Sequence, residues 1–335
     1  SSPDETVIQH GAPFNLGLHK YSGNCYSPNG HKYIREYDCI VLSKTTYRVG
    51  GVILTKERIL VSFEPRVLIR YTLVEAHPAT TLRFKPFLAF RSVNELTHEN
   101  PVANPNMDEC ENGRVNRMYS QFPALYMQFS KAVEYHHNPT WYKNIEYQKE
   151  QERGYEYKED LLVPGYFELP MKKGESVIFS AGVTETETKK LKNLWKTETE
   201  RRIAREDMFA CLKNSASQFY KREGDKCYLL AGYPWFHTTA REEFFATPSC
   251  TLDIDRPEYW EAIIDKTAIG EVEQFMTSGS NDGLGIQGMD EPDALLWLIR
   301  AFQKYAHKYT PKQAADKYAD LCVKIIDYYR KQNHP

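Results

Sequence analysis

The stretch GYPWFHTTAREEFF, residues 232–245, separates two parts of the chain that differ in pattern. Before it, apolar residues mostly alternate with polar ones, as they do in half-buried strands. After it, apolar residues recur at the three-to-four spacing of helices. The stretch itself gathers aromatic rings, a proline, an arginine and two glutamates. The pattern therefore predicts a β part followed by an α part, with a polar and aromatic segment where they join.

The composition of the 335 residues narrows the function classes. The chain has 43 basic and 45 acidic residues, which argues against a nucleic-acid or anionic-membrane surface, because such surfaces need clustered positive charge. Aromatic residues make up 13% and include 23 tyrosines. Large sheets favour aromatics and are the better explanation from composition alone, while contact with carbohydrate is the functional one.

Cysteine usage and targeting patterns bear on the compartment. The seven cysteines are odd in number, widely spaced and without a C-x-x-C, so neither a disulfide framework nor a zinc site is indicated. Reduced thiols of a cytoplasmic protein are the expectation. We see no signal peptide at the start and no apolar run of membrane-spanning length. The chain also lacks an initiator methionine, which is typical of a fragment.

Residues 1–183 are predicted to form an antiparallel β sandwich. Their apolar runs have the length and spacing of sandwich strands, and Pro86 places the end or edge of a strand. The runs are 47–54, 58–63, 66–74, 80–85, 124–129, 161–169 and 176–179.

Two stretches interrupt the β pattern. Residues 94–116 are polar and contain two prolines, so we expect a long loop, which could overhang a neighbouring site. His136 and His137 are adjacent, but neighbours on a strand point to opposite faces and no third ligand is well spaced. We therefore expect no metal site, and the absence of nucleotide-binding glycine motifs predicts no cofactor.

The rest of the chain is predicted to be helical. Residues 184–222 are expected to form a linker that becomes one long helix, and 223–335 a set of helices. Asp255 is a candidate N-cap before Pro257, Asp293 opens an amphipathic helix after a glycine-rich loop, and Pro311 begins the last helix.

Three charged residues are candidates for chemistry. Arg241 and Glu242 lie where a loop enters a helix, as does Asp293, and loops at the same end of a helical barrel converge. Glycoside hydrolysis uses two carboxyl groups, one acting as acid and the other as base or nucleophile. From their positions alone, a structural role explains Glu242 and Asp293 better than catalysis does, because the helix dipole favours carboxylates in the first turn of a helix.

The chain resembles the microbial glycogen-debranching, amylo-α-1,6-glucosidase family. Residues 232–242 are similar to its G-Y-P-W-F-x-x-W-G-R-D signature, and residues 293–297, DALLW, resemble its D-A-S-L-W-F segment. Weaker likenesses lie in the β part, at 35–42, 86–91 and 163–167. The resemblance implies an antiparallel β super-sandwich followed by part of an (α/α)6 toroid.

The resemblance also implies roles for individual residues. Asp293 would be the general acid of an inverting hydrolase that removes α-1,6-linked glucose from glycogen-like glucans, and the base is expected beyond Pro335. The substrate-binding residues would be Trp235, Phe236, Arg241, Glu242 and Trp297. The partners would be a glucan and the remaining toroid helices of the same polypeptide, without which this chain alone is expected to be inactive.

This sequence departs from the signature at three positions. Thr239 replaces its tryptophan, Ala240 its glycine, and Glu242 its aspartate. Glutamate is one methylene longer, and a shift of about 1 Å in a positioned group costs about a hundredfold in rate. Two alternatives therefore stay open: a non-catalytic carbohydrate-binding or assembly module on the same fold, and a related glycoside phosphorylase.

Overall fold

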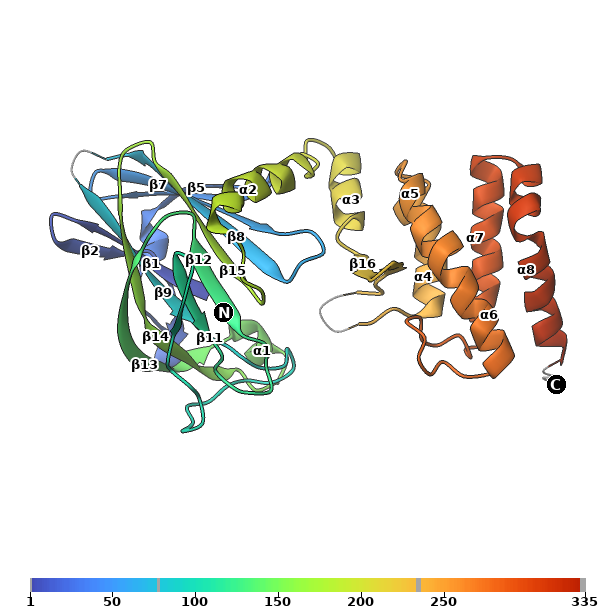
Figure 1. Cartoon of the computed structure of the whole chain (residues 1–335), viewed down its shortest axis with the longest axis horizontal. Helices are drawn as coiled ribbons and strands as arrows, with labels where there is room; N and C mark the ends of the chain where they lie inside the picture. The colour runs from blue at the N-terminus through green and yellow to red at the C-terminus, as the bar shows by residue number, and fades with distance from the viewer. Residues whose placement is uncertain (1, 77–78, 233–235, 332–335) are drawn as a thin grey trace. The chain divides into compact units, whose positions relative to one another are not determined.

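The protein contains two compact units, Ser1–Arg202 and Ile203–Pro335, called here the β unit and the helical unit. The computed structural model describes residues 2–76, 79–232 and 236–331 (Figure 1). The expected β part followed by an α part is confirmed. The division at Arg202 lies inside the segment 184–222, and the partition into 1–183, 184–222 and 223–335 stays a prediction.

Two antiparallel sheets form the β unit. The five-stranded sheet has the order β13-β14-β9-β1-β2, and the eight-stranded sheet the order β10-β11-β12-β15-β8-β7-β6-β5. The bounds of their strands are β1 Ser2–Gln9, β2 Ala12–Asn15, β5 Ile34–Asp38, β6 Ser43–Val49, β7 Val52–Leu60, β8 Arg66–Glu75, β9 Thr80–Phe87, β10 Asp108–Cys110, β11 Gly113–Asn116, β12 Leu125–Phe129, β13 Glu134–Glu146, β14 Lys158–Met171 and β15 Ser176–Gly182. The smaller elements of the unit are the paired strands β3 Lys20–Tyr21 and β4 Cys25–Tyr26, the turns η1 Ser22–Asn24, η2 Gly30–Tyr33 and η3 Thr188–Lys190, and the helix α1 Gln148–Glu152.

The main core lies between the two sheets. Phe84 from β9 packs against Phe129 from β12 and Phe179 from β15, with ring centroids 5.5 and 4.3 Å apart. Alternate residues of β9 are buried, as the period of two predicts. Pro86 lies at the end of this strand as expected, although β9 is an inner strand of its sheet.

The strand boundaries follow from local chemistry. Gly50 and Gly51 form the turn between β6 and β7 with φ angles of 54° and 80°, which glycine adopts without steric cost. The run 58–63 is not a separate strand, because β7 continues through Leu60.

The segment 184–222 differs from the expected single helix. It contains α2 Leu191–Glu200, α3 Met208–Ala216 and the start of a hairpin formed by β16 Tyr220–Glu223 and β17 Lys226–Leu229. The carboxylate of Asp207 accepts a hydrogen bond of 2.7 Å from the amide of Ala210, and this N-cap starts a new helix where a continuous one was expected.

Helix α2 covers the outer face of the eight-stranded sheet. Leu191 and Trp195 pack in one buried cluster with Leu68 of β8 and Ile178 of β15. Arg70 places its guanidinium 4.8 Å from the centroid of the Trp195 ring. The linker thus belongs to the β unit as far as Arg202.

The helical unit is built around one apolar cluster. Trp260 donates a hydrogen bond of 2.9 Å to the Tyr318 hydroxyl, and Phe302 stacks on Tyr318 with ring centroids 4.1 Å apart. Its remaining helices are α4 Ala240–Thr251, α5 Pro257–Trp260, the π-helical segment η4 Glu261–Ala268, α6 Ile269–Ser278, α7 Ala294–Lys308 and α8 Pro311–Lys331. No helix among the described residues has the length and apolar character needed to cross a membrane.

Two smaller expectations need correction. Arg256, and not Asp255, is the N-cap residue before Pro257, since Asp255 takes a positive φ of 56°. His136 and His137 do not interrupt the β pattern, because both lie inside β13. The ring of His136 stacks on Tyr166, with ring centroids 4.8 Å apart.

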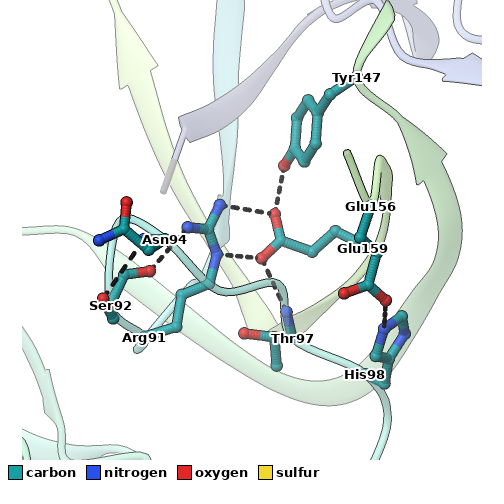
Figure 2. Close-up of polar contacts among 8 residues, drawn as sticks. All are labelled: Arg91, Ser92, Asn94, Thr97, His98, Tyr147, Glu156 and Glu159. Carbon is teal, nitrogen blue, oxygen red and sulfur yellow. Dashed lines mark hydrogen bonds and ion pairs between the residues drawn. The ribbon is translucent and has the colours of Figure 1, made fainter. Parts of the chain in front are cut away.

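The long loop is confirmed in its first part and replaced by the hairpin β10-β11 in its second. A buried carboxylate holds it to the β unit (Figure 2). Glu159 of β14 accepts hydrogen bonds from Arg91, from the Tyr147 hydroxyl, and from the Thr97 amide at 3.1 Å. Burial alone would raise the pKa of Glu159, but these hydrogen bonds outweigh it and lower the pKa.

Glu159→Gln is expected to lower the free energy of unfolding by about 3 kcal/mol at neutral pH, because it breaks a buried ion pair. A carboxyl whose pKa is lowered in the folded state stabilises it above the unfolded pKa, and that stability is lost as the pH falls through the folded pKa. Urea denaturation should therefore show that the difference in unfolding free energy between wild type and Glu159→Gln shrinks as the pH falls below about 4.3. Glu156→Gln removes an exposed carboxylate that pairs with His98, and it should change stability little. An equal loss of stability in both variants would contradict the role of Glu159 in holding the loop.

Candidate active site

The loops that precede α4 and α7 are joined by their backbones. The Ala240 amide donates to the Gln287 carbonyl at 2.8 Å, and the Gln287 amide donates to the Thr238 carbonyl at 3.1 Å. This short parallel bridge brings the N-terminal ends of the two helices to one place. The predicted convergence of these two loops is therefore confirmed.

Arg241 and Asp293 are in direct contact across this junction. The Nε and Nη2 of Arg241 donate to Oδ1 of Asp293 at 3.1 and 2.6 Å. The indole Nε1 of Trp297, one helical turn further along α7, donates to Oδ2 at 3.0 Å. Both oxygens of the carboxylate are thus engaged, although the side chain is 44% exposed.

Two further predicted residues, Glu242 and Phe236, have exposed side chains. The carboxylate of Glu242 accepts a hydrogen bond of 2.5 Å from the Thr239 hydroxyl. The two residues that differ from the signature tryptophan and aspartate are thus in contact with each other. Phe236 is 64% exposed. Trp235 lies outside the described residues. The side chains of Arg241, Asp293 and Phe236 are therefore all accessible to solvent.

Two residues that the sequence did not single out belong to the same cluster. Glu291 forms an ion pair of 3.0 Å with Nη2 of Arg241. Phe245 stands edge-on to Trp297, with ring centroids 4.9 Å apart, and is 63% exposed. Phe245 lies one helical turn after Arg241, and that spacing could have placed it on the same face of α4.

The electrostatics of Asp293 are those of an ionised group. Hydrogen bonds from Arg241 and then from Trp297 lower the pKa of its carboxyl. A general acid for glycoside hydrolysis needs a raised pKa, so that it carries a proton at working pH. In this conformation Asp293 is therefore held as a carboxylate.

Two glutamates of the helical unit are buried, and Glu271 holds a loop in place. Glu271 of α6 accepts hydrogen bonds from Lys226 at 2.7 Å, the Tyr228 hydroxyl at 2.8 Å and the Ile286 amide at 2.9 Å. The last of these fixes the glycine-rich loop that leads to Asp293. Burial would raise the pKa of Glu271, but the three donors lower it.

Glu243 is buried with far less compensation. One oxygen accepts a hydrogen bond of 3.3 Å from the Leu229 amide, and Oε2 has no partner among the described residues. Burial and the neighbouring Glu271 raise its pKa well above the usual value, against the opposing effect of that amide. Its position was readable from sequence, because the buried face of α4 repeats at helical spacing through Ala240, Glu243, Phe244 and Thr247.

No group of three or more metal-ligating side chains is found within the part of the chain that the structure describes. The geometry instead provides an arginine, carboxylates and aromatic rings at the joined ends of two helices.

Comparison with known families assigns the β unit. A family model described as glycogen debranching enzyme N terminal matches residues 1–178. The chain belongs to this family. The match confirms the resemblance read from the sequence, and it covers the two sheets almost completely.

No curated protein matches the chain. Among solved structures, a bacterial glucoamylase complexed with acarbose shares 10% identity with a TM-score of 0.42, covering 94% of this chain and 52% of its own. The chain thus spans about half the length of that glucoamylase.

Two lyases are also similar in part. A polysaccharide lyase shares 14% identity over 57% of this chain and 27% of its own, with a TM-score of 0.26. A mutant heparan sulfate lyase from Pedobacter heparinus shares 13% identity over 54% and 30%, with a TM-score of 0.29. TM-scores this low carry no argument about fold or activity.

Arg241→Gln is expected to raise the pKa of the Asp293 carboxyl towards its ordinary value, because it removes the largest cause of the shift. Carbon-detected NMR titration of the side-chain carboxyl measures this directly. Arg300→Gln, on the same helix as Asp293, is the matched control and should leave the titration unchanged. An unchanged titration in Arg241→Gln would contradict the ion pair.

Glu243→Gln is expected to increase stability at neutral and higher pH. A carboxyl with a raised folded pKa costs stability progressively as the pH rises above its unfolded pKa, since ionisation is easier in the unfolded chain. The amide keeps an oxygen for the Leu229 amide and has no charge to bury. Urea denaturation between pH 5 and 9 should show the variant gaining on the wild type as the pH rises; a constant difference would show that the pKa of Glu243 is not raised in the folded chain.

Proposed function

We propose that the chain is part of a glycoside hydrolase of the glycogen-debranching type, which removes α-1,6-linked glucose from glycogen-like glucans with inversion of configuration. The observation that carries the proposal is the contact of Arg241 with Asp293 and of Asp293 with Trp297, on the motifs that resemble this family. The membership of residues 1–178 in the debranching-enzyme family supports the substrate class. In this proposal the β unit is a super-sandwich, the helical unit is part of an (α/α)6 toroid, and the location is cytoplasmic.

The proposed roles follow from the contacts. Arg241 and Glu242 hold hydroxyls of the terminal glucose, while Trp235, Phe236 and Trp297 wall its ring. Asp293 protonates the glycosidic oxygen. Binding of glucose hydroxyls to Arg241 would withdraw its hydrogen bonds from Asp293, so the pKa of that carboxyl rises when substrate is present. The hydrogen bonds of Arg241 thus favour the ionised form of Asp293 in the resting site, and their loss on substrate binding shifts the balance towards the protonated form.

One observation favours the alternative of a non-catalytic carbohydrate-binding module. Asp293 is held as a carboxylate by its partners, and a carboxylate beside an arginine and aromatic rings binds sugar hydroxyls without any proton transfer. The two functions differ in turnover and share the same contacts, so a kinetic experiment separates them.

The test is glucose release from a branched limit dextrin by the full-length protein. Asp293→Asn should reduce the rate at least about a hundredfold, as expected for loss of a positioned proton donor. NMR of the first glucose released should show the β anomer, because inversion of an α-linkage gives β-glucose.

Asp282→Asn is the matched control, because Asp282 is an exposed carboxylate of the same loop. Its glucose release should equal that of the wild type. Full activity in Asp293→Asn would overturn the assignment of the acid, and absence of glucose release from the wild type would favour the binding module.

A further inference from the structure

A cavity of about 480 Å³ opens in the β unit, which contains none of the candidate catalytic residues. It is lined by the start of β1, at Asp4 and Glu5, by segment 16–20 and by residues of strands β4, β6 and β7. The end of β13 and Tyr147 complete the lining. Its volume lies in the range of small-ligand sites, about 300–1,000 Å³.

Charged and polar side chains line the cavity in pairs. Two of the three carboxylates on the wall pair with lysines, and the third contacts a histidine ring. The pairs are Asp4 with His19 at 2.9 Å, Glu5 with Lys56 at 2.6 Å, and Glu146 with Lys20 at 2.8 Å. Such a wall offers both donors and acceptors to a neutral polar ligand.

Aromatic rings supply the remaining character of the wall. Tyr26 is 40% exposed, whereas Tyr47 is buried and Tyr147 lies partly buried beside the cavity. Burial raises the pKa of Tyr47 to about 12, so its hydroxyl keeps its proton. Because tyrosine rings lie among hydrogen-bond donors and acceptors, the cavity has both apolar and polar surfaces. A pyranose ring likewise has apolar faces and polar hydroxyl groups.

The wall is built by close packing of the backbone. A Cβ on Gly17 would lie 2.6 Å from the Asp4 carboxylate, and one on Gly30 would lie 2.1 Å from the Leu16 carbonyl group. Glycine at these positions lets segment 16–20 lie directly over the start of β1. The cavity therefore has a defined backbone frame.

We propose that this cavity binds a glucosyl unit of a glucan as a second site, separate from the helical unit. Each hydroxyl of a sugar both donates and accepts, which matches a wall where carboxylates lie beside lysine and histidine side chains. The exposed ring of Tyr26 packs on the apolar face of the sugar. The choice of glucose over other neutral sugars rests on the proposed function, while the class of ligand rests on the cavity itself.

The experiment uses maltotriose as the probe and the full chain carrying Asp293→Asn, with affinity measured by isothermal titration calorimetry. Tyr26→Ala in that background is expected to weaken binding about tenfold, which corresponds to about 1.4 kcal/mol. Tyr37→Ala removes an exposed tyrosine of the same unit outside the cavity, and it should bind as tightly as the parent.

A second variant tests the cavity by filling it. Leu18 lines the cavity and is 45% exposed, so Leu18→Trp should narrow the opening without disturbing the core and weaken maltotriose binding by a similar factor. Unchanged affinity in both Tyr26→Ala and Leu18→Trp, or no binding by the parent, would overturn the second site.

Outcomes for the two proposals are distinguishable. Glucose release from limit dextrin reports on Asp293, and maltotriose affinity in the Asp293→Asn background reports on the cavity. Maltotriose binding that depends on Tyr26, without any glucose release, would support the second site and contradict the proposed hydrolase activity. Glucose release, together with maltotriose binding that is unchanged in Tyr26→Ala and Leu18→Trp, would support the hydrolase and contradict the second site.

Discussion

The candidate site depends on two backbone hydrogen bonds, between Ala240 and Gln287 and between Gln287 and Thr238. They join loops that lie about fifty residues apart in the chain and set the starts of α4 and α7 side by side. Because backbone groups make the bridge, it tolerates changes of side chain at these positions. The replacements at Thr239 and Ala240 are therefore compatible with the arrangement that brings Arg241 to Asp293.

Buried carboxylates recur where loops must be held to the framework. Glu159 holds the loop at Thr97, and Glu271 holds the loop at Ile286, each through several donors that offset the cost of burial. Glu243 lacks such compensation, and the protein accommodates it by favouring the neutral acid. Buried glutamates thus hold loops in place at Glu159 and Glu271, whereas burial of Glu243 lowers stability.

Much of the fold could be predicted, because it follows local periodicity. The alternation in β8 and β9 and the helical stripes in α7 and α8 are properties of consecutive residues. The failures are also local in origin. The expected linker helix stops at Glu200, and Asp207 caps a second helix that starts at Met208. The short, polar hairpin β16-β17 has too few apolar residues for a readable period.

The sequence by itself determined the order of a β part and an α part, and the motifs at residues 232–242 and 293–297 from which Arg241 and Asp293 were chosen. Only the tertiary structure decided that these two side chains touch, and that Asp293 rests as a carboxylate between Arg241 and Trp297. The cavity beside β1 was also invisible in the sequence, since its walls come from strands far apart in the chain. Contact and pKa depend on distances in space, and a linear pattern records only spacing along the chain.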